Sequence, residues 1–171
     1  QTNVLKRYYD AAKYYKASII VRLTGDDPFK TPSIIDLAIK KLQKFDLDYC
    51  SNTIDKTFPE GLDVEVFTFS ALRKTFLEAS KDYEYEHVTP YIWENKKNNF
   101  RIGQILTKLD RSNWRMTIDY YQDYIALVKL AKLVRFDCNY REIVKTVEKN
   151  NLKSVSHPSI KRNEAYNGSK F

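Results

Sequence analysis

Two consecutive aspartates follow an apolar, β-branched run near the beginning of the sequence. Residues 18–23 are typical of a buried strand, and Gly25, Asp26, Asp27 and Pro28 come shortly after that run. In an open α/β sheet, ligands bind beyond the carboxyl ends of the strands, where a carboxylate can hold a hard divalent cation against a phosphate. Gly, Asp and Pro are also the ordinary residues of turns, so a plain turn is the simpler interpretation of this segment taken alone.

A second acidic position lies far along the chain, again at the end of a short apolar segment. Asp119 follows residues 114–118, which read as a strand, and precedes a helical pattern that begins at Tyr121. A helix N-cap is one interpretation of this aspartate. The other is that two strand-ending aspartates converge on one edge of a sheet, because Mg²⁺ is usually held by one or two carboxylates together with substrate phosphates. Asp26 and Asp119 are therefore the candidate catalytic residues and metal ligands, and Asp27 is the candidate turn residue.

Two further segments carry weaker candidates. Asp63 and Glu65 alternate with two valines, so they share one face of an expected strand, where they could bind sugar hydroxyls or face water. Glu86 precedes His87, one of only two histidines in the chain. A lone histidine on a helix is more often structural or exposed than catalytic. The sequence contains no glycine-rich phosphate loop, serine nucleophile elbow or Cys/His pair.

The composition is that of an ordinary folded domain. The chain has 171 residues, 43% of them hydrophobic and 30% charged, which excludes disordered and collagen-like classes. A net charge of +7 suits an anionic partner, but the basic residues are scattered as on solvated helix faces, and no nucleic-acid motif appears. No apolar stretch approaches the roughly 20 residues that span a bilayer. Cys50 and Cys138 lack metal-ligand spacing, and without a secretory signal they predict a reducing, cytoplasmic setting.

Strand and helix patterns alternate along the chain. Strands are expected at residues 18–23, 48–52, 63–67, 100–106 and 114–118, and helices at 3–15, 31–42, 70–80, 84–95, 121–134 and 140–149. Asn3 and Ser70 are the expected N-caps of two of these helices, and Pro90 marks a new helix start. The alternation predicts an α/β fold with a largely parallel sheet of βαβ units. Residues 1–153 read as one domain, and residues 154–171 as a tail without periodicity.

Six separated segments resemble, in the same order, the cytidylyltransferases of the acylneuraminate and Kdo type. They are residues 4–9, 20–28, 51–53, 61–67, 86–92 and 114–119. Residues 160–166 also resemble the spore-coat polysaccharide biosynthesis branch of that family. The resemblance implies a nucleotide-diphospho-sugar transferase-like α/β fold, in which helices flank a Rossmann-like mixed sheet. It also implies transfer of CMP from CTP to a sugar, with release of pyrophosphate, for a surface polysaccharide or glycan.

The resemblance also implies functional roles for the residues of this sequence that match functional positions of the family. Asp26 matches the first metal aspartate of the family and Asp119 the second, so Mg²⁺ is the implied cofactor. The implied substrate-binding positions on the sugar side are Arg22, Asp63, Glu65, Glu86 and His87. The basic N-terminal loop of the family, with the pattern A-R-x-G-S-x-R-L-P-x-K, is not matched, so the fold is expected to lack its N-terminal βαβ part. A homodimer, or pairing with a chain that supplies this part, is the expected assembly.

Three other functions stay open on the sequence alone. A non-catalytic, basic and tyrosine-rich interaction module would bind nucleic acid or a partner protein. A fragment without its N-terminal half would be inactive. A related transferase would use another nucleotide. The scattered basic residues make nucleic acid the weaker of the possible partners.

Overall fold

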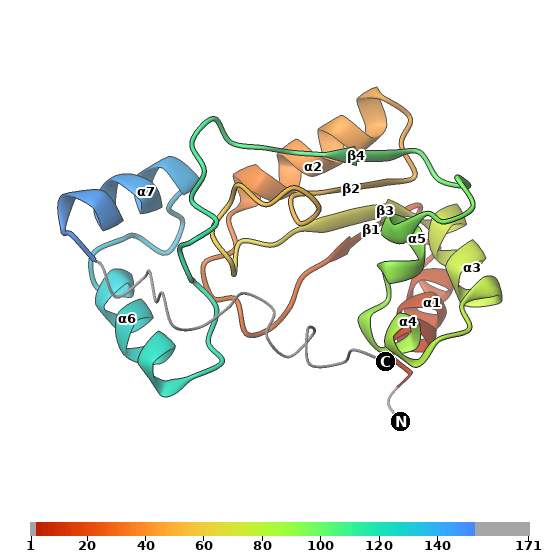
Figure 1. Cartoon of the computed structure of the whole chain (residues 1–171), viewed down its shortest axis with the longest axis horizontal. Coiled ribbons are helices and arrows are strands. Elements are labelled where there is room, and N and C mark those ends of the chain that lie inside the picture. Colours follow the sequence, from red (N-terminus) through yellow and green to blue (C-terminus); the bar gives the residue numbers. More distant parts are fainter. Residues whose placement is uncertain (1–2, 153–171) are drawn as a thin grey trace. The chain divides into compact units, whose positions relative to one another are not determined.

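Four short strands form one mixed sheet (Figure 1). In a computed structural model that describes residues 3–152, the strands are β1 (Ile19–Arg22), β2 (Tyr49–Ser51), β3 (Glu65–Thr68) and β4 (Ile102–Gln104). Their order is β1-β3-β2-β4, with β3 antiparallel to both of its neighbours and β2 parallel to β4. The expected α/β class with a mixed sheet is confirmed. The expectation of a largely parallel sheet is wrong.

The insertion of β3 between β1 and β2 accounts for this difference. A helix, α2 (Pro32–Lys44), lies between β1 and β2 in the chain, and these two strands run in the same direction. Residues 52–64, by contrast, pass from β2 to β3 without a helix. Parallel neighbours are usually joined by a helical crossover, and β3, which arrives by a connection without a helix, pairs antiparallel with β2. It is also antiparallel to β1, because β1 and β2 run in the same direction.

The helices begin and end close to the expected residues. They are α1 (Val4–Tyr14), α2, α3 (Phe69–Glu78), α4 (Asp82–His87), α5 (Pro90–Glu94), α6 (Tyr121–Ala131) and α7 (Tyr140–Lys149). The Asn3 side chain accepts a hydrogen bond from the backbone N–H of Lys6 at 2.8 Å, which confirms that cap. Pro90 opens α5, so the expected 84–95 stretch forms two short helices.

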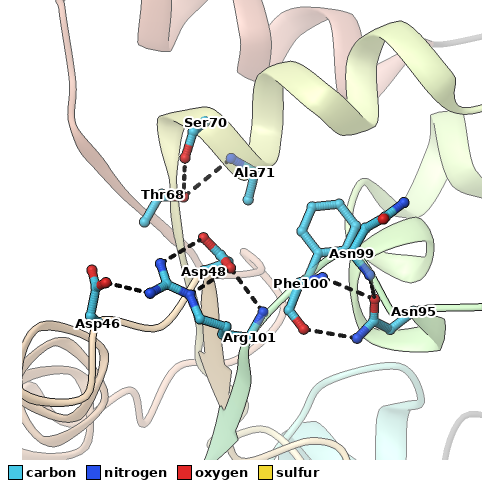
Figure 2. Close-up of polar contacts among 9 residues, drawn as sticks. All are labelled: Asp46, Asp48, Thr68, Ser70, Ala71, Asn95, Asn99, Phe100 and Arg101. Carbon is cyan, nitrogen blue, oxygen red and sulfur yellow. Dashed lines mark hydrogen bonds and ion pairs between the residues drawn. The ribbon is translucent and has the colours of Figure 1, made fainter. Parts of the chain in front are cut away.

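Two expected local features are wrong. Thr68, not Ser70, caps α3, because the helix starts at Phe69 and the Thr68 hydroxyl accepts from the N–H of Ala71 at 3.1 Å (Figure 2). Residues 114–118 do not form a strand. Within the described range they contribute one isolated parallel bridge, between Glu60 and Arg115, because no sheet strand lies alongside them.

The chain divides into two compact units. Unit 1 comprises the residues up to Leu23, Ile35–Asp55 and Val64–Ile105, so it holds the whole sheet. Unit 2 comprises Thr24–Ile34, Lys56–Asp63 and the chain from Leu106 onward, with α6 and α7. The predicted tail at 154–171 lies outside the described residues. No helix in the range 3–152 is long and apolar enough to cross a bilayer.

The core of unit 1 gathers on one face of the sheet. Ile20, Tyr49 and Phe67 occupy paired positions on adjacent strands and are all buried. Against them pack apolar residues of α1, α3 and α5 and the residue that follows α4, namely Leu5, Ala12, Ala71, Leu72, Ile92 and Val88, with Phe100 beyond. Cys50 lies on the opposite face in β2; it is a free thiol like Cys138, and burial raises its pKa.

Polar contacts fix the start of β4 beside β2. Asp48 accepts hydrogen bonds from the backbone N–H of Arg101 at 2.8 Å and from its guanidinium at 3.2 Å, and Asp46 pairs with the same side chain (Figure 2). Asn95, in a left-handed conformation, accepts from the N–H of Phe100 at 3.1 Å and donates to its carbonyl at 2.9 Å. The Arg101 pairs are exposed and contribute little stability, but the backbone contacts define the strand register.

Candidate active site

The turn after β1 brings Asp26 beside the segment that contains Asp119. The backbone N–H of Ile118 donates to the carbonyl of Asp26 at 2.9 Å, and all of these residues belong to unit 2. Asp26 is exposed, and within residues 3–152 no hydrogen bond or ion pair engages its carboxylate. Asp26 and Asp119, the two residues expected to share a metal ion, are 93 positions apart in the sequence. The hydrogen bond from Ile118 nevertheless places them on neighbouring backbone segments.

Asp27 has a different environment from its neighbour. It is 8% exposed, accepts a hydrogen bond from the Thr24 hydroxyl at 2.6 Å and pairs with the Lys30 ammonium at 2.6 Å. Lys30 also donates to the backbone carbonyl of Asp63. Asp27 thus closes the turn and ties it to a second loop, as expected of a turn residue, while Asp26 points its carboxylate to solvent.

Arg115 is the centre of a buried network of charges around Asp119. This arginine is 6% exposed, and its guanidinium donates to Glu60 at 2.7 Å, to Asp123 at 2.9 and 3.2 Å, and to one carboxylate oxygen of Asp119. Asp123 also accepts the backbone N–H groups of Asp119 at 3.1 Å and of Tyr120 at 3.0 Å. The N-cap interpretation of Asp119 is wrong, because Tyr120 holds that position and Asp123 satisfies the free N–H groups.

Arg115 and Asp123 both stay charged near neutral pH. Burial disfavours the charged guanidinium, but the hydrogen bond to Asp123 and the charges of Glu60 and Asp123 outweigh it, so the pKa of Arg115 is raised. Burial also opposes ionisation of Asp123, yet the Arg115 hydrogen bond and two backbone N–H groups lower its pKa. Three carboxylates thus surround one guanidinium, which leaves a local excess of negative charge.

The side chains of Asp26 and Asp119 carry carboxylate oxygens of the kind that Mg²⁺ prefers as ligands. The Asp119 side chain is 47% exposed, and its second carboxylate oxygen accepts no hydrogen bond in the described part of the chain. No group of three or more His, Cys, Asp or Glu side chains among residues 3–152 could hold a metal ion alone. Mg²⁺ keeps several waters and is usually bound by one or two carboxylates plus substrate phosphates, so two hard oxygen ligands are a sufficient protein contribution.

A second buried charge lies in unit 1, at the start of β3. Glu65 is 6% exposed; it pairs with Arg22 at 2.5 Å and accepts from the hydroxyls of Tyr49 at 2.6 Å and Thr89 at 2.5 Å. The alternative that Glu65 faces water is wrong. Sequence reasoning missed Tyr49 and Thr89, because neither position carries a local signal of pairing with residue 65.

The remaining predicted substrate residues differ in their local environments. Asp63 precedes β3, which begins at Glu65, so the two do not share a strand face as expected. Glu86 is exposed and His87 half-buried at the end of α4. The next residue, Val88, has a φ of 73°, which is a true outlier for a β-branched residue. Its strained backbone directly precedes Thr89, the partner of Glu65.

Replacing Tyr49 by Phe is expected to lower the free energy of unfolding by about 1.5 kcal/mol at pH 7, since a buried hydrogen bond to a charged group is lost. Burial, followed by the charge of Glu65 and the hydrogen bond to it, raises the pKa of Tyr49 well above its usual value. In the unfolded chain a tyrosine loses its proton near pH 10. The stabilisation is therefore complete below about pH 10 and lost as the pH rises through the folded-state pKa.

Urea unfolding at pH 7 and at about pH 11 measures this effect. The difference between wild type and Tyr49→Phe should shrink at the higher pH. Tyr14→Phe is the matched control, because Tyr14 is 79% exposed in the same unit and, among the described residues, its ring contacts that of Tyr15 alone. Equal effects of the two substitutions would contradict the assigned role of Tyr49.

Comparisons with known proteins agree on one family. A cytidylyltransferase family model matches residues 1–157. An uncharacterized protein of Methanocaldococcus jannaschii, MJ1063, is 39% identical over 155 residues, which cover 88% of this chain and 61% of that protein. The spore coat polysaccharide biosynthesis protein SpsF of Bacillus subtilis is 31% identical over 158 residues, covering 88% of this chain and 63% of SpsF.

A solved structure extends the agreement to three dimensions. The structure of a cytidylyltransferase from Leptospira borgpetersenii matches with a TM-score of 0.85 at 32% sequence identity. The match covers 94% of this chain and 68% of that structure. The chain spans less than two thirds of the length of the curated relatives it matches, 61% and 63%.

Proposed function

This chain belongs to the cytidylyltransferase family, and on that premise we propose that it forms the metal-binding part of a nucleotidyltransferase that transfers CMP from CTP to a sugar. The product would be a CMP-activated sugar for a surface polysaccharide or glycan. The observation that best supports this proposal is the hydrogen bond from the Ile118 N–H to the Asp26 carbonyl. Because of this bond, the backbone segments that carry the two candidate metal ligands, Asp26 and Asp119, lie side by side. Because CTP is an intracellular nucleotide and both thiols are free, we propose the cytoplasm as the location.

In the proposed reaction a sugar oxygen attacks the α-phosphorus of CTP. A new bond forms between that oxygen and phosphorus, and the bond to the bridging oxygen of the pyrophosphate breaks, so pyrophosphate carries away the electron pair. The proton of the attacking sugar hydroxyl passes to solvent. Mg²⁺ bound at Asp26 and Asp119 would offset charge on the α-phosphate and on the leaving group. Lys30, which already closes the Asp27 turn, and Arg115 keep these two segments in place before substrate arrives.

On the sugar side we propose Arg22, Asp63, Glu65, Glu86 and His87. Glu65 would act indirectly, because its carboxylate is buried and engaged by three partners. It would hold Arg22, whose side chain is 20% exposed, at the end of β1. Glu86 is exposed and can contact a ligand without loss of any hydrogen bond found in the range 3–152.

We further propose that another segment or chain supplies the contacts to the cytidine base and the triphosphate. The support is the outer side of β1, which is an edge strand in the described sheet. Beside it lies a mostly apolar cavity of about 380 Å³, lined by α1 residues such as Tyr8, Ala11 and Tyr15 and by Ile19 and Ile20. An uncovered edge strand with an apolar flank is a ready template for an added strand.

Turnover of radiolabelled CTP tests the proposal. We expect pyrophosphate release and a labelled CMP-sugar from a panel of acidic sugars when a segment or chain that supplies the proposed contacts to CTP is present. CTP should compete for binding better than ATP, GTP or UTP. Preference for another nucleotide would contradict the CMP assignment. Absence of turnover, together with affinity for nucleic acid that falls steeply with salt, would instead support a basic interaction module.

A further inference from the structure

We infer that Arg115 is a positioning residue that holds the Asp119 carboxylate by one oxygen and so presents the other oxygen to the cation. This inference rests on the proposed metal role of Asp119. Arg115 itself would not contact metal or nucleotide. It would act only through the carboxylate to which it donates.

The guanidinium of Arg115 is anchored on three sides. One terminal nitrogen donates to Glu60 at 2.7 Å, the Nε donates to Asp123 at 2.9 Å, and the other terminal nitrogen is shared between Asp123 and Asp119. Its side chain is 6% exposed, as is that of Asp123. Because the planar guanidinium is hydrogen-bonded at Nε and at both terminal nitrogens, it cannot rotate without breaking buried, charged hydrogen bonds. Arg115 therefore offers Asp119 a fixed point of attachment.

Asp119 has few other constraints. Its side chain is 47% exposed, and the contact with Arg115 is the only hydrogen bond or ion pair that its carboxylate makes within the described range. The same network also holds the backbone, because Asp123 accepts the N–H of Asp119 at 3.1 Å. One set of buried side chains thus fixes both the backbone and the carboxylate of an otherwise solvent-facing residue.

Positioning and simple electrostatics make opposite predictions about Arg115. A positive charge beside Asp119 should repel a cation, so its removal alone would tighten metal binding. If Arg115 instead fixes the ligand, its loss should weaken binding, since groups that orient metal ligands typically contribute 10–100-fold in affinity. A lysine at position 115 keeps the positive charge but lacks the planar guanidinium, so weaker metal binding by that variant would report the loss of positioning.

Titration of Mn²⁺ into the chain, followed by the electron paramagnetic resonance signal of the free ion, tests the inference without turnover. We expect Arg115→Lys to raise the Mn²⁺ dissociation constant about tenfold. Arg111→Lys is the matched control in the same unit. Arg111 pairs with Glu148 at 2.7 Å and its side chain is 14% exposed, and no hydrogen bond or ion pair found among residues 3–152 links it to Asp119. The control should leave Mn²⁺ binding within about twofold.

A second variant covers the case in which Arg115→Lys does not fold. Arg115→Met combined with Glu60→Gln removes one positive and one negative charge, so the net charge of the network is unchanged, and Asp123 keeps the backbone N–H groups of Asp119 and Tyr120 as hydrogen-bond partners. We expect the same tenfold weakening. Unchanged or tighter Mn²⁺ binding by a folded variant would overturn the inference. If Asp119→Asn leaves Mn²⁺ binding unchanged, the metal proposal itself is refuted, and the inference falls with its premise.

Discussion

Replacing Asp119 by Asn is expected to lower CTP turnover by about 10²–10³-fold, the size of effect seen when one group that stabilises developing charge is removed. The substitution keeps the shape of the side chain and removes its charge. The amide oxygen can still accept the hydrogen bond from Arg115, so the network in unit 2 should stay intact. The loss would therefore appear in catalysis, because a neutral amide is a poorer ligand for a hard divalent cation than a carboxylate.

Three aspartate-to-asparagine variants, measured in a form of the protein that turns over CTP, make this prediction specific. Asp26→Asn should lose activity to a similar extent, because the exposed carboxylate of Asp26 is accessible to a cation. Asp27→Asn is the matched control, since Asp27 pairs with Lys30 and should affect stability more than turnover. Full activity with Asp26→Asn and Asp119→Asn together would show that neither residue holds the metal.

The sequence predicts that the segments containing Asp26 and Asp119 lie close together. The structure brings them together through contacts that differ from the expected ones. The pattern of residues 114–118 suggested a strand whose end meets the end of β1 at one sheet edge. The segment instead forms one bridge with Glu60 and then a single hydrogen bond from Ile118 to Asp26. Apolar alternation over five residues indicates extended backbone, and extended backbone alone does not specify a sheet partner.

The network around Arg115 could not be predicted in the same way. Arg115, Asp119 and Asp123 are spaced four apart, which on a helix would align them on one face. Only Asp123 lies in α6, however, and the first partner, Glu60, comes from a loop 55 positions earlier. An ion pair between residues far apart in the sequence depends on the tertiary contacts between loops. The periodicity of a single sequence does not predict such contacts.

The sheet order shows the same limit at the scale of the fold. Strands of three or four residues carry too little alternation to indicate direction, so β3 was not expected between β1 and β2. The buried Glu65 illustrates the consequence. Its three partners come from β1, β2 and the residue before α5, and they meet only because β3 is the central strand between β1 and β2.

The Gly61→Ala substitution is expected to destabilise unit 2 by about 3–5 kcal/mol, through overpacking together with a strained backbone and lost hydrogen bonds. Gly61 has a φ of +91°, and a Cβ atom there would lie 2.3 Å from the carbonyl carbon of Met116 and 2.6 Å from the backbone nitrogen of Thr117. Backbone atoms cannot rotate away as a side chain can. The two segments would have to separate, which would break the hydrogen bond from Met116 N–H to the Glu60 carbonyl at 2.7 Å.

Gly25→Ala is the matched control for this prediction. An added Cβ at Gly25 meets no heavy atom within 4 Å, and Gly61 is the glycine with positive φ in the described range. Alanine at Gly25 should therefore change the free energy of unfolding by no more than about 1 kcal/mol, in the stabilising direction. Urea unfolding of the two variants measures the difference. Similar values would mean that the backbone segments around Glu60 and Met116 can separate at little cost in free energy. The backbone that carries Arg115 would then not be held rigidly enough for Arg115 to position Asp119.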